Sequence, residues 1–154
     1  MIYIYYLLLV LGSFAFMEGV AWFSHKYIMH GPLWFIHKTH HVIGKGPFQL
    51  NDVFAIIFAV PSWLFMQFGV MAGFDYRFYI GIGITLYGVW YFIVHDVFVH
   101  QRVKWLKTTK NKYMQGLRRA HKVHHKSLTK ENCECFGFLF VPRKYHSQYN
   151  EPPE

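Results

Sequence analysis

Three long apolar segments constrain the fold of this chain more than any other feature. Residues 2–23 carry a single charged side chain, and residues 53–74 and 78–94 carry none. Such runs approach the roughly 20 residues that a helix needs to cross the hydrocarbon layer, although the third is short unless it continues further. Only helices and closed barrels satisfy every backbone hydrogen bond in lipid. The sequence therefore predicts an all-α integral membrane protein with about three transmembrane helices, four being the alternative.

The composition supports this prediction. Hydrophobic residues make up 53% of the chain and charged residues only 16%, against about 25% charged residues in a typical soluble domain. We expect one membrane domain over residues 1–154, with spans at approximately 2–24, 53–74 and 77–98. The first run has neither a basic leader nor a small-residue cleavage site, so we expect it to remain in the mature protein. Pro61 should kink the second span.

The distribution of basic residues predicts the orientation. Residues 100–154 hold twelve Lys and Arg against four acids, and residues 25–51 hold three Lys and no acid. Because cytoplasmic loops carry an excess of Lys and Arg, we expect segments 25–51 and 99–154 to be cytoplasmic. In a bacterium, the protein would lie in the inner membrane. Basic residues beside a membrane span are expected anyway, so the charge does not indicate nucleic-acid binding.

Ten of the eleven histidines fall into two copies of one pattern. Each copy reads HxxxxH followed by HxxHH, and each begins where a span that runs inward ends. The first copy contains His25, His30, His37, His40 and His41, and the second contains His95, His100, His121, His124 and His125. The two spans between the copies return the chain to the same side. We therefore expect one histidine-rich helical cap on the cytoplasmic side, with His146 outside it.

Helix geometry indicates how these imidazoles divide. Residues at i+3 and i+4 share a helical face, so HxxHH aims several rings into one site. Residues at i+5 lie about 140° apart on a regular helix and do not chelate one ion unless the helix widens or ends between them. Ten imidazoles favour iron, copper, zinc or nickel. We predict two metal ions with the histidines divided between them.

Several segments resemble a known family. "WFSHKYIMHGPLWFIHKTHH", "VHDVFVHQR" and "AHKVHHKSLTKENCECFGF" resemble the bacterial β-carotene hydroxylases, which lie within the fatty acid hydroxylase and sterol desaturase superfamily of membrane di-iron oxygenases. The likeness runs from about residue 22 to residue 142. It implies that the ten box histidines bind two iron ions. It also implies O₂-dependent hydroxylation of carbon 3 of β-ionone rings, giving zeaxanthin via cryptoxanthin, with O₂ as co-substrate and electrons from an external donor.

Four further residues are candidates for supporting roles. Asp96 follows His95 directly, and Glu18 lies two turns before His25, so either carboxylate could accept the free N–H of a ligand imidazole. Pairing within the helix bundle is the alternative for Glu18. The basic stretch that contains Arg118 and Arg119 is expected to dock an acidic ferredoxin-type donor or to contact anionic lipid. Cys133 and Cys135 are interpreted as reduced thiols.

Other functions remain open on the residues alone. The same machinery could hydroxylate or desaturate a fatty acyl chain or a sterol. A histidine-rich metal transporter would place its ligands along the spans, whereas here they lie at the span ends. A membrane protein without chemistry is disfavoured by the duplicated boxes.

Overall fold

The computed structural model describes residues 1–42 and 48–146. Its long helices are α1 (Ile2–Phe23), α3 (Val53–Met71) and α4 (Tyr76–Phe92), and its shorter helices are α2 (Trp34–His41) and α5 (Lys112–Lys126). Two π-helices extend α1 and α4, over Ser24–Met29 and Ile93–Val99, and short 3-10 turns lie at Leu50–Asp52 and Arg143–Tyr145. The described part of the chain contains no strand, which confirms the all-α prediction.

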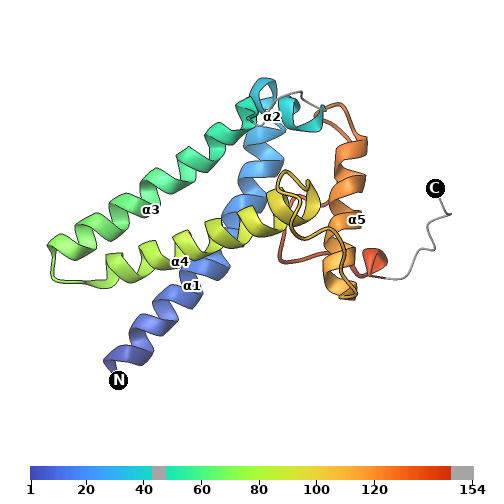
Figure 1. Cartoon of the computed structure of the whole chain (residues 1–154). Coiled ribbons are helices and arrows are strands. Elements are labelled where there is room, and N and C mark those ends of the chain that lie inside the picture. The colour runs from blue at the N-terminus through green and yellow to red at the C-terminus, as the bar shows by residue number, and fades with distance from the viewer. Residues whose placement is uncertain (43–47, 147–154) are drawn as a thin grey trace.

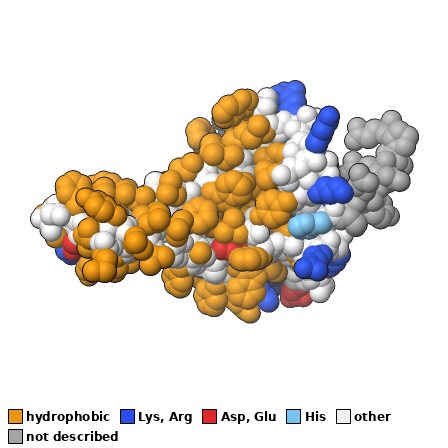
Figure 2. Space-filling model, turned by 90° about the horizontal axis from the view of Figure 1, so that it is seen from below, with side chains coloured by type: hydrophobic (Ala, Val, Ile, Leu, Met, Phe, Trp, Pro, Cys, Tyr) orange, Lys and Arg blue, Asp and Glu red, His pale blue; other side chains and the backbone are white. Residues whose placement is uncertain are grey.

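Three continuous helical stretches are long and apolar enough to cross a membrane. They are Ile2–Met29, Leu50–Met71 and Tyr76–Val99, with mean hydropathies of 1.8, 1.9 and 1.6. No other described helix qualifies, so the prediction of three spans holds rather than that of four. Helix α3 continues through Pro61. Exposed apolar side chains cover the long helices, while Lys and Arg gather at the opposite end of the molecule (Figure 2).

Helix α4 packs against both other spans. Against α1 it runs parallel, since Tyr6 stacks on Tyr79 with ring centroids 3.9 Å apart and Phe14 meets Tyr87 further along. Against α3 it runs antiparallel, since Gly69 lies against Phe78 near the turn and Ser62 Oγ lies 2.7 Å from Thr85 Oγ1 further along. Spans one and three are therefore parallel, as predicted, and α3 provides the return.

A tight turn joins α3 to α4. Gly73 and Phe74 adopt positive φ there, and the Asp75 carboxylate accepts a hydrogen bond from the Arg77 backbone N–H to cap α4. At the opposite end, α2 and α5 lie beside the ends of α1 and α4 and form the cap that carries the histidines (Figure 1). The candidate site lies in this cap.

Candidate metal centre

The two HxxxxH pairs lie on π-helices. The His30 N–H donates to the His25 carbonyl at 3.0 Å, and the His100 N–H donates to the His95 carbonyl at 2.9 Å. This i to i+5 bond widens the helix and brings residues five apart onto the same face. The 140° separation of a regular helix therefore does not apply, and the members of each pair belong to the same group of imidazoles.

The imidazoles form two buried groups of metal-binding geometry. Within each group the ring nitrogens that face one another lie within 4.8 Å. The first group is His25, His30, His37 and His124, and the second group is His40, His95, His100 and His121. Each group thus takes three histidines from one copy of the pattern and one from the other copy.

Each group combines histidines of both copies because α2 and α5 each present histidines on two faces. On α2, His37 joins the first group and His40 joins the second. The two remaining box histidines lie between the groups. His41 Nε2 is 3.2 Å from His37 Nε2, and the His41 ring stacks on the His125 ring with centroids 4.5 Å apart. Ten histidines are thus gathered in one place, which agrees with the predicted single cluster.

Most of these rings have a fixed tautomer. In seven of them Nδ1 lies 2.7 to 3.2 Å from a hydrogen-bond acceptor, while Nε2 points inward. Four rings donate to backbone carbonyls: His25 to Phe136, His30 to Lys130, His41 to Ser127 and His124 to Glu134. Three donate to side chains: His37 to Asn51 Oδ1, His40 to Gln49 Oε1 and His95 to the Asp96 carboxylate. Such partners orient metal-ligating imidazoles and raise their basicity.

The inward nitrogens favour a bound cation. His30 and His124 each donate Nδ1–H to a backbone carbonyl, so in their neutral forms the two Nε2 atoms, 3.2 Å apart, face each other with lone pairs. Facing lone pairs repel unless a positive charge lies between them. Burial also lowers the pKa of His30 to about 4 and the pKa of His124 to about 3, so protons are poor candidates for that charge. The donor sets therefore fit metal ions.

An unsatisfied nitrogen of the same kind lies beside the second group. His125 Nε2 is buried without a hydrogen-bond partner, and the ring centroid of His125 lies 4.4 Å from that of His121 and 4.6 Å from that of His40. Buried polar atoms normally find a partner. An ion held by the second group would supply one.

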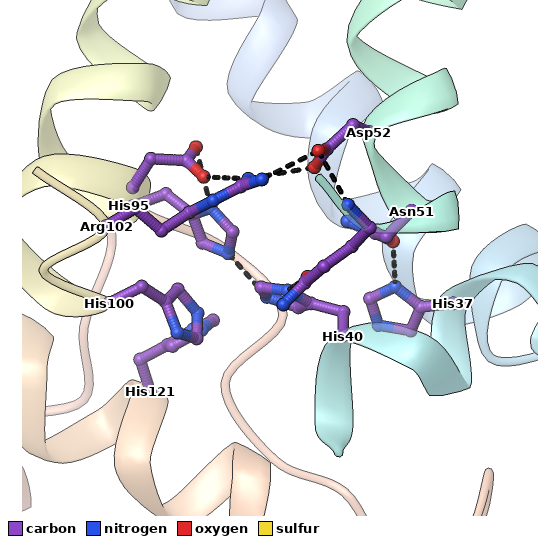
Figure 3. Close-up of polar contacts among 10 residues, drawn as sticks. His37, His40, Asn51, Asp52, His95, His100, Arg102 and His121 are labelled. Atoms are coloured by element: carbon purple, nitrogen blue, oxygen red, sulfur yellow. Dashed lines mark hydrogen bonds and ion pairs between the residues drawn. The ribbon is translucent and has the colours of Figure 1, made fainter. Parts of the chain in front are cut away.

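Arg102 connects the residues that hold His95 with those that hold His40, both in the second group (Figure 3). Asp96 accepts from His95 Nδ1 at 3.1 Å and from Arg102 at 2.7 Å, so Asp96 occupies the position predicted for a supporting carboxylate. The Arg102 guanidinium also binds both oxygens of Asp52, at 2.8 and 2.7 Å. Asp52 in turn accepts the backbone N–H of Gln49, whose side chain holds His40. Sequence reasoning missed this network because Arg102 and Asp52 are 50 residues apart.

Glu18 has a different partner from the predicted one. Its Oε1 accepts the backbone N–H groups of Phe138 and Leu139, both at 2.7 Å, and its Oε2 accepts the Tyr87 hydroxyl at 2.7 Å. No hydrogen bond to a histidine is present among its described contacts; its partners are Tyr87 of α4 and the segment that follows α5. Its effect on the site is indirect, because it anchors the segment whose Phe136 carbonyl holds His25.

Arg118 and Arg119 are engaged in the fold rather than presented to a partner. Arg118 donates to the carbonyls of Phe98 and Lys107 and lies over the Phe98 ring at 4.1 Å, and Arg119 donates to the Tyr145 carbonyl. Their side chains hold the 101–110 segment and the C-terminal turn against α5. As predicted, His146 lies outside both groups. The structure places its ring next to Gly116. Cys133 and Cys135 are free thiols.

An apolar cavity leads from the spans to both groups. It has a volume of about 560 Å³ and lies among α1, α3 and α4. His25, His37 and His95 contribute to its lining at the cap end, and Met66 contributes at the far end. From Asp52 to Met66 the cavity follows α3 for 14 residues, or about 20 Å at 1.5 Å per residue. A hydrophobic molecule entering from the membrane would therefore meet the histidines end-on.

Comparison with known families agrees with this architecture. The family model described as "Fatty acid hydroxylase" matches residues 10–142, which include all ten box histidines. The chain belongs to the fatty acid hydroxylase family. Iron-dependent hydroxylases make up this family, and the two histidine groups fit a metal site.

Individual relatives point to one branch of the family. The "Beta-carotene hydroxylase" of Pantoea ananas is 41% identical over 92% of this chain and 81% of its own length. That of Paracoccus sp. (strain PC1) is 35% identical over 88% of this chain and 83% of its own length. The "Beta-carotene 3-hydroxylase, chloroplastic" of Haematococcus lacustris is 44% identical over 77% of this chain and 38% of its own length. No solved structure matches the chain.

Proposed function

We propose that this protein is a β-carotene 3-hydroxylase that forms zeaxanthin via cryptoxanthin. The observation that carries the proposal is the apolar cavity that runs within the spans and ends at His25, His37 and His95. A C40 hydrocarbon dissolved in the bilayer can enter such a cavity ring first. Three bacterial relatives, of which this chain covers 76–83%, are named as hydroxylases of β-carotene, which favours that substrate over an acyl chain or a sterol.

Two iron ions fit the two histidine groups. His25, His30, His37 and His124 would hold one, His40, His95, His100 and His121 would hold the other, and His41 and His125 are placed beside them. Bound iron would activate O₂, which is the oxidant; with two electrons from the external donor and two protons, one oxygen atom would enter the C–H bond and the other would leave as water. The protein orients the ligand nitrogens through their Nδ1 partners, excludes water from the buried rings and aims one end of the substrate at them.

The electron donor would approach the exposed surface of the cap. Arg118 and Arg119 are bonded within the fold, whereas Lys104, Lys107, Lys110, Lys112 and Lys122 are exposed. These lysines suit an acidic ferredoxin-type donor or anionic headgroups. Turnover with reconstituted ferredoxin should fall as salt rises if they dock the donor.

Expression in bacteria that make β-carotene tests the proposed function. We expect zeaxanthin and cryptoxanthin in pigment extracts and two iron ions per chain in the purified protein. His124→Ala should abolish both products, and His146→Ala, which changes a histidine outside both groups, should retain them. Unchanged carotene together with hydroxylated acyl or sterol lipids would reassign the substrate, and an active protein with one ion or none would overturn the two-iron assignment.

A further inference from the structure

Three glycines of α4 have different surroundings. A Cβ on Gly81 would lie 2.6 Å from Met66 Cγ and 2.9 Å from the Ser62 carbonyl, so α3 packs closely there. A Cβ on Gly83 would overlap Ser13 and Val10 of α1. A Cβ on Gly88 would meet nothing within 4 Å. The first two glycines are explained by close helix packing, but Gly88 is not.

The space beside Gly88 is the cavity. Gly88 contributes to its lining together with Ala59 and Ala55 of α3 and Ala21 of α1. The Ser62–Thr85 hydrogen bond fixes the antiparallel register of α3 and α4. Three residues further toward the cap on each helix are Ala59 and Gly88, which places an alanine of α3 and the lining glycine of α4 at the same depth.

The depth of this position distinguishes it from the reacting end. Gly88 precedes His95 by seven residues, or about 10 Å along the helix. A β-ionone ring held near His95 would therefore lie on the cap side of Gly88, and the chain attached to the ring would have to pass Gly88. Larger side chains line the cavity on both sides of this position: Trp63 and Met66 on the far side, and Phe54, Tyr91 and Phe92 on the cap side.

We propose that Gly88 and Ala59 form a slot through which the polyene of the substrate passes, so that their small size determines whether a long, rigid chain reaches the metal centre. This inference rests on the proposed function. A conjugated polyene cannot bend around an obstruction, so even one added side chain in the slot should exclude it. The space beside Gly88 is open, so an added side chain would take up the volume that the polyene needs and not displace neighbouring side chains.

Substitution of Gly88 by Ala, Leu and Phe, in the full chain expressed with β-carotene, tests the slot. We expect product formation to fall in the order of side-chain size, by roughly tenfold or more for Gly88→Leu, with the amount of protein and the iron content unchanged. Gly12 of α1 also has nothing within 4 Å of its Cβ position but does not line the cavity, so the same three substitutions at Gly12 should have little effect.

A second variant separates slot width from a general defect. Ala59→Gly in the Gly88→Ala background restores the space that the added methyl group fills, so it should recover product relative to Gly88→Ala alone. Wild-type turnover of Gly88→Leu, or equal losses in the Gly12 and Gly88 series, would overturn the slot. An inactive wild-type protein would instead count against the proposed function.

Discussion

Among single residues that are not proposed metal ligands, Arg102 should have the clearest effect on metal binding. Arg102→Gln removes the guanidinium that links Asp52 to Asp96, and Asp96 and Gln49 then lose the support that orients His95 and His40. Partners of this kind typically change metal affinity by about 10–100-fold. We expect the variant to lose the second ion to a chelator while keeping the first.

A matched control exists at the other end of the bundle. Arg77 also pairs with an aspartate, Asp75, at 2.8 Å, but at the α3–α4 turn far from the histidines. Arg77→Gln should retain two ions under the same chelator. Equal metal contents of the Arg102→Gln and wild-type proteins would contradict the role assigned to Arg102.

Residue types and spacing predicted much of the site, but not its hydrogen-bond acceptors. The repeated pattern identified the ten box histidines, and the adjacency of Asp96 to His95 predicted their contact. The backbone carbonyls of Ser127, Lys130, Glu134 and Phe136 have no sequence signature, because every residue carries a carbonyl. Asn51 and Gln49 also escaped notice, since an amide in a loop is common and its partner is known only once the chain is folded.

At the scale of elements, the segment after the last histidine box depends on Glu18. Its carboxyl group accepts three consecutive backbone N–H groups, from Phe138 to Phe140. A Cβ on Gly137 would lie 2.6 Å from Glu18 Oε1, so only glycine permits this approach. The carbonyls that hold four box histidines belong to the same segment, residues 127–136.

Glu18→Ala and Gly137→Ala should both release this segment. Each leaves buried N–H donors without their acceptor, at about 1–3 kcal/mol per group. We expect faster hydrogen exchange over residues 127–141 and loss of metal from the first group. Gly19→Ala, next to Glu18 but with open space around its Cβ position, is the control. Unchanged exchange in Gly137→Ala would show that the segment is held by other contacts.

The helix types show where sequence reasoning reached its limit. Apolar length predicted α1, α3 and α4, and HxxHH predicted helical structure at α2 and α5. The widening of the helix over Ser24–Met29 and Ile93–Val99 was named only as an exception to regular geometry. A π-helix forms where tertiary contacts repay its weaker backbone geometry. For Ser24–Met29 those contacts include the hydrogen bonds of His25 and His30 to the carbonyls of Phe136 and Lys130, 111 and 100 residues away, which a local pattern does not contain.

At the scale of the whole molecule, the distribution of charge predicts the topology in the membrane. The basic residues of α5 and its flanking segments lie at the histidine end. The opposite end has one charge of each sign where α3 joins α4, Asp75 before α4 and Arg77 in its first turn. Reporter fusions at the C-terminus should therefore report the cytoplasm, and fusions in the turn near Gly73 the opposite side. A C-terminus on the outer side would contradict the predicted orientation in the membrane, although not the arrangement of the two histidine groups.

Because both histidine groups lie at one end of the bundle, the two rings of β-carotene should be hydroxylated in two separate encounters. β-Carotene is about as long as the hydrocarbon core is thick, roughly 30 Å, and the cavity reaches the histidines at one end, so a single ring reacts in each encounter. After the first hydroxylation the polar ring favours the membrane surface. The second ring reaches the site only if the product leaves and reverses, which moves a hydroxyl through the bilayer at a cost of about 2–7 kcal/mol.

Free cryptoxanthin should therefore accumulate before zeaxanthin. A time course in β-carotene-producing cells at low enzyme level, followed by pigment chromatography, measures this directly. Raising the enzyme level should shorten the lag between the two products, because the intermediate is recaptured by any copy of the enzyme. Zeaxanthin that forms from the earliest time without free cryptoxanthin, at every enzyme level, would require both rings to react in one encounter, and access from one end would then be wrong.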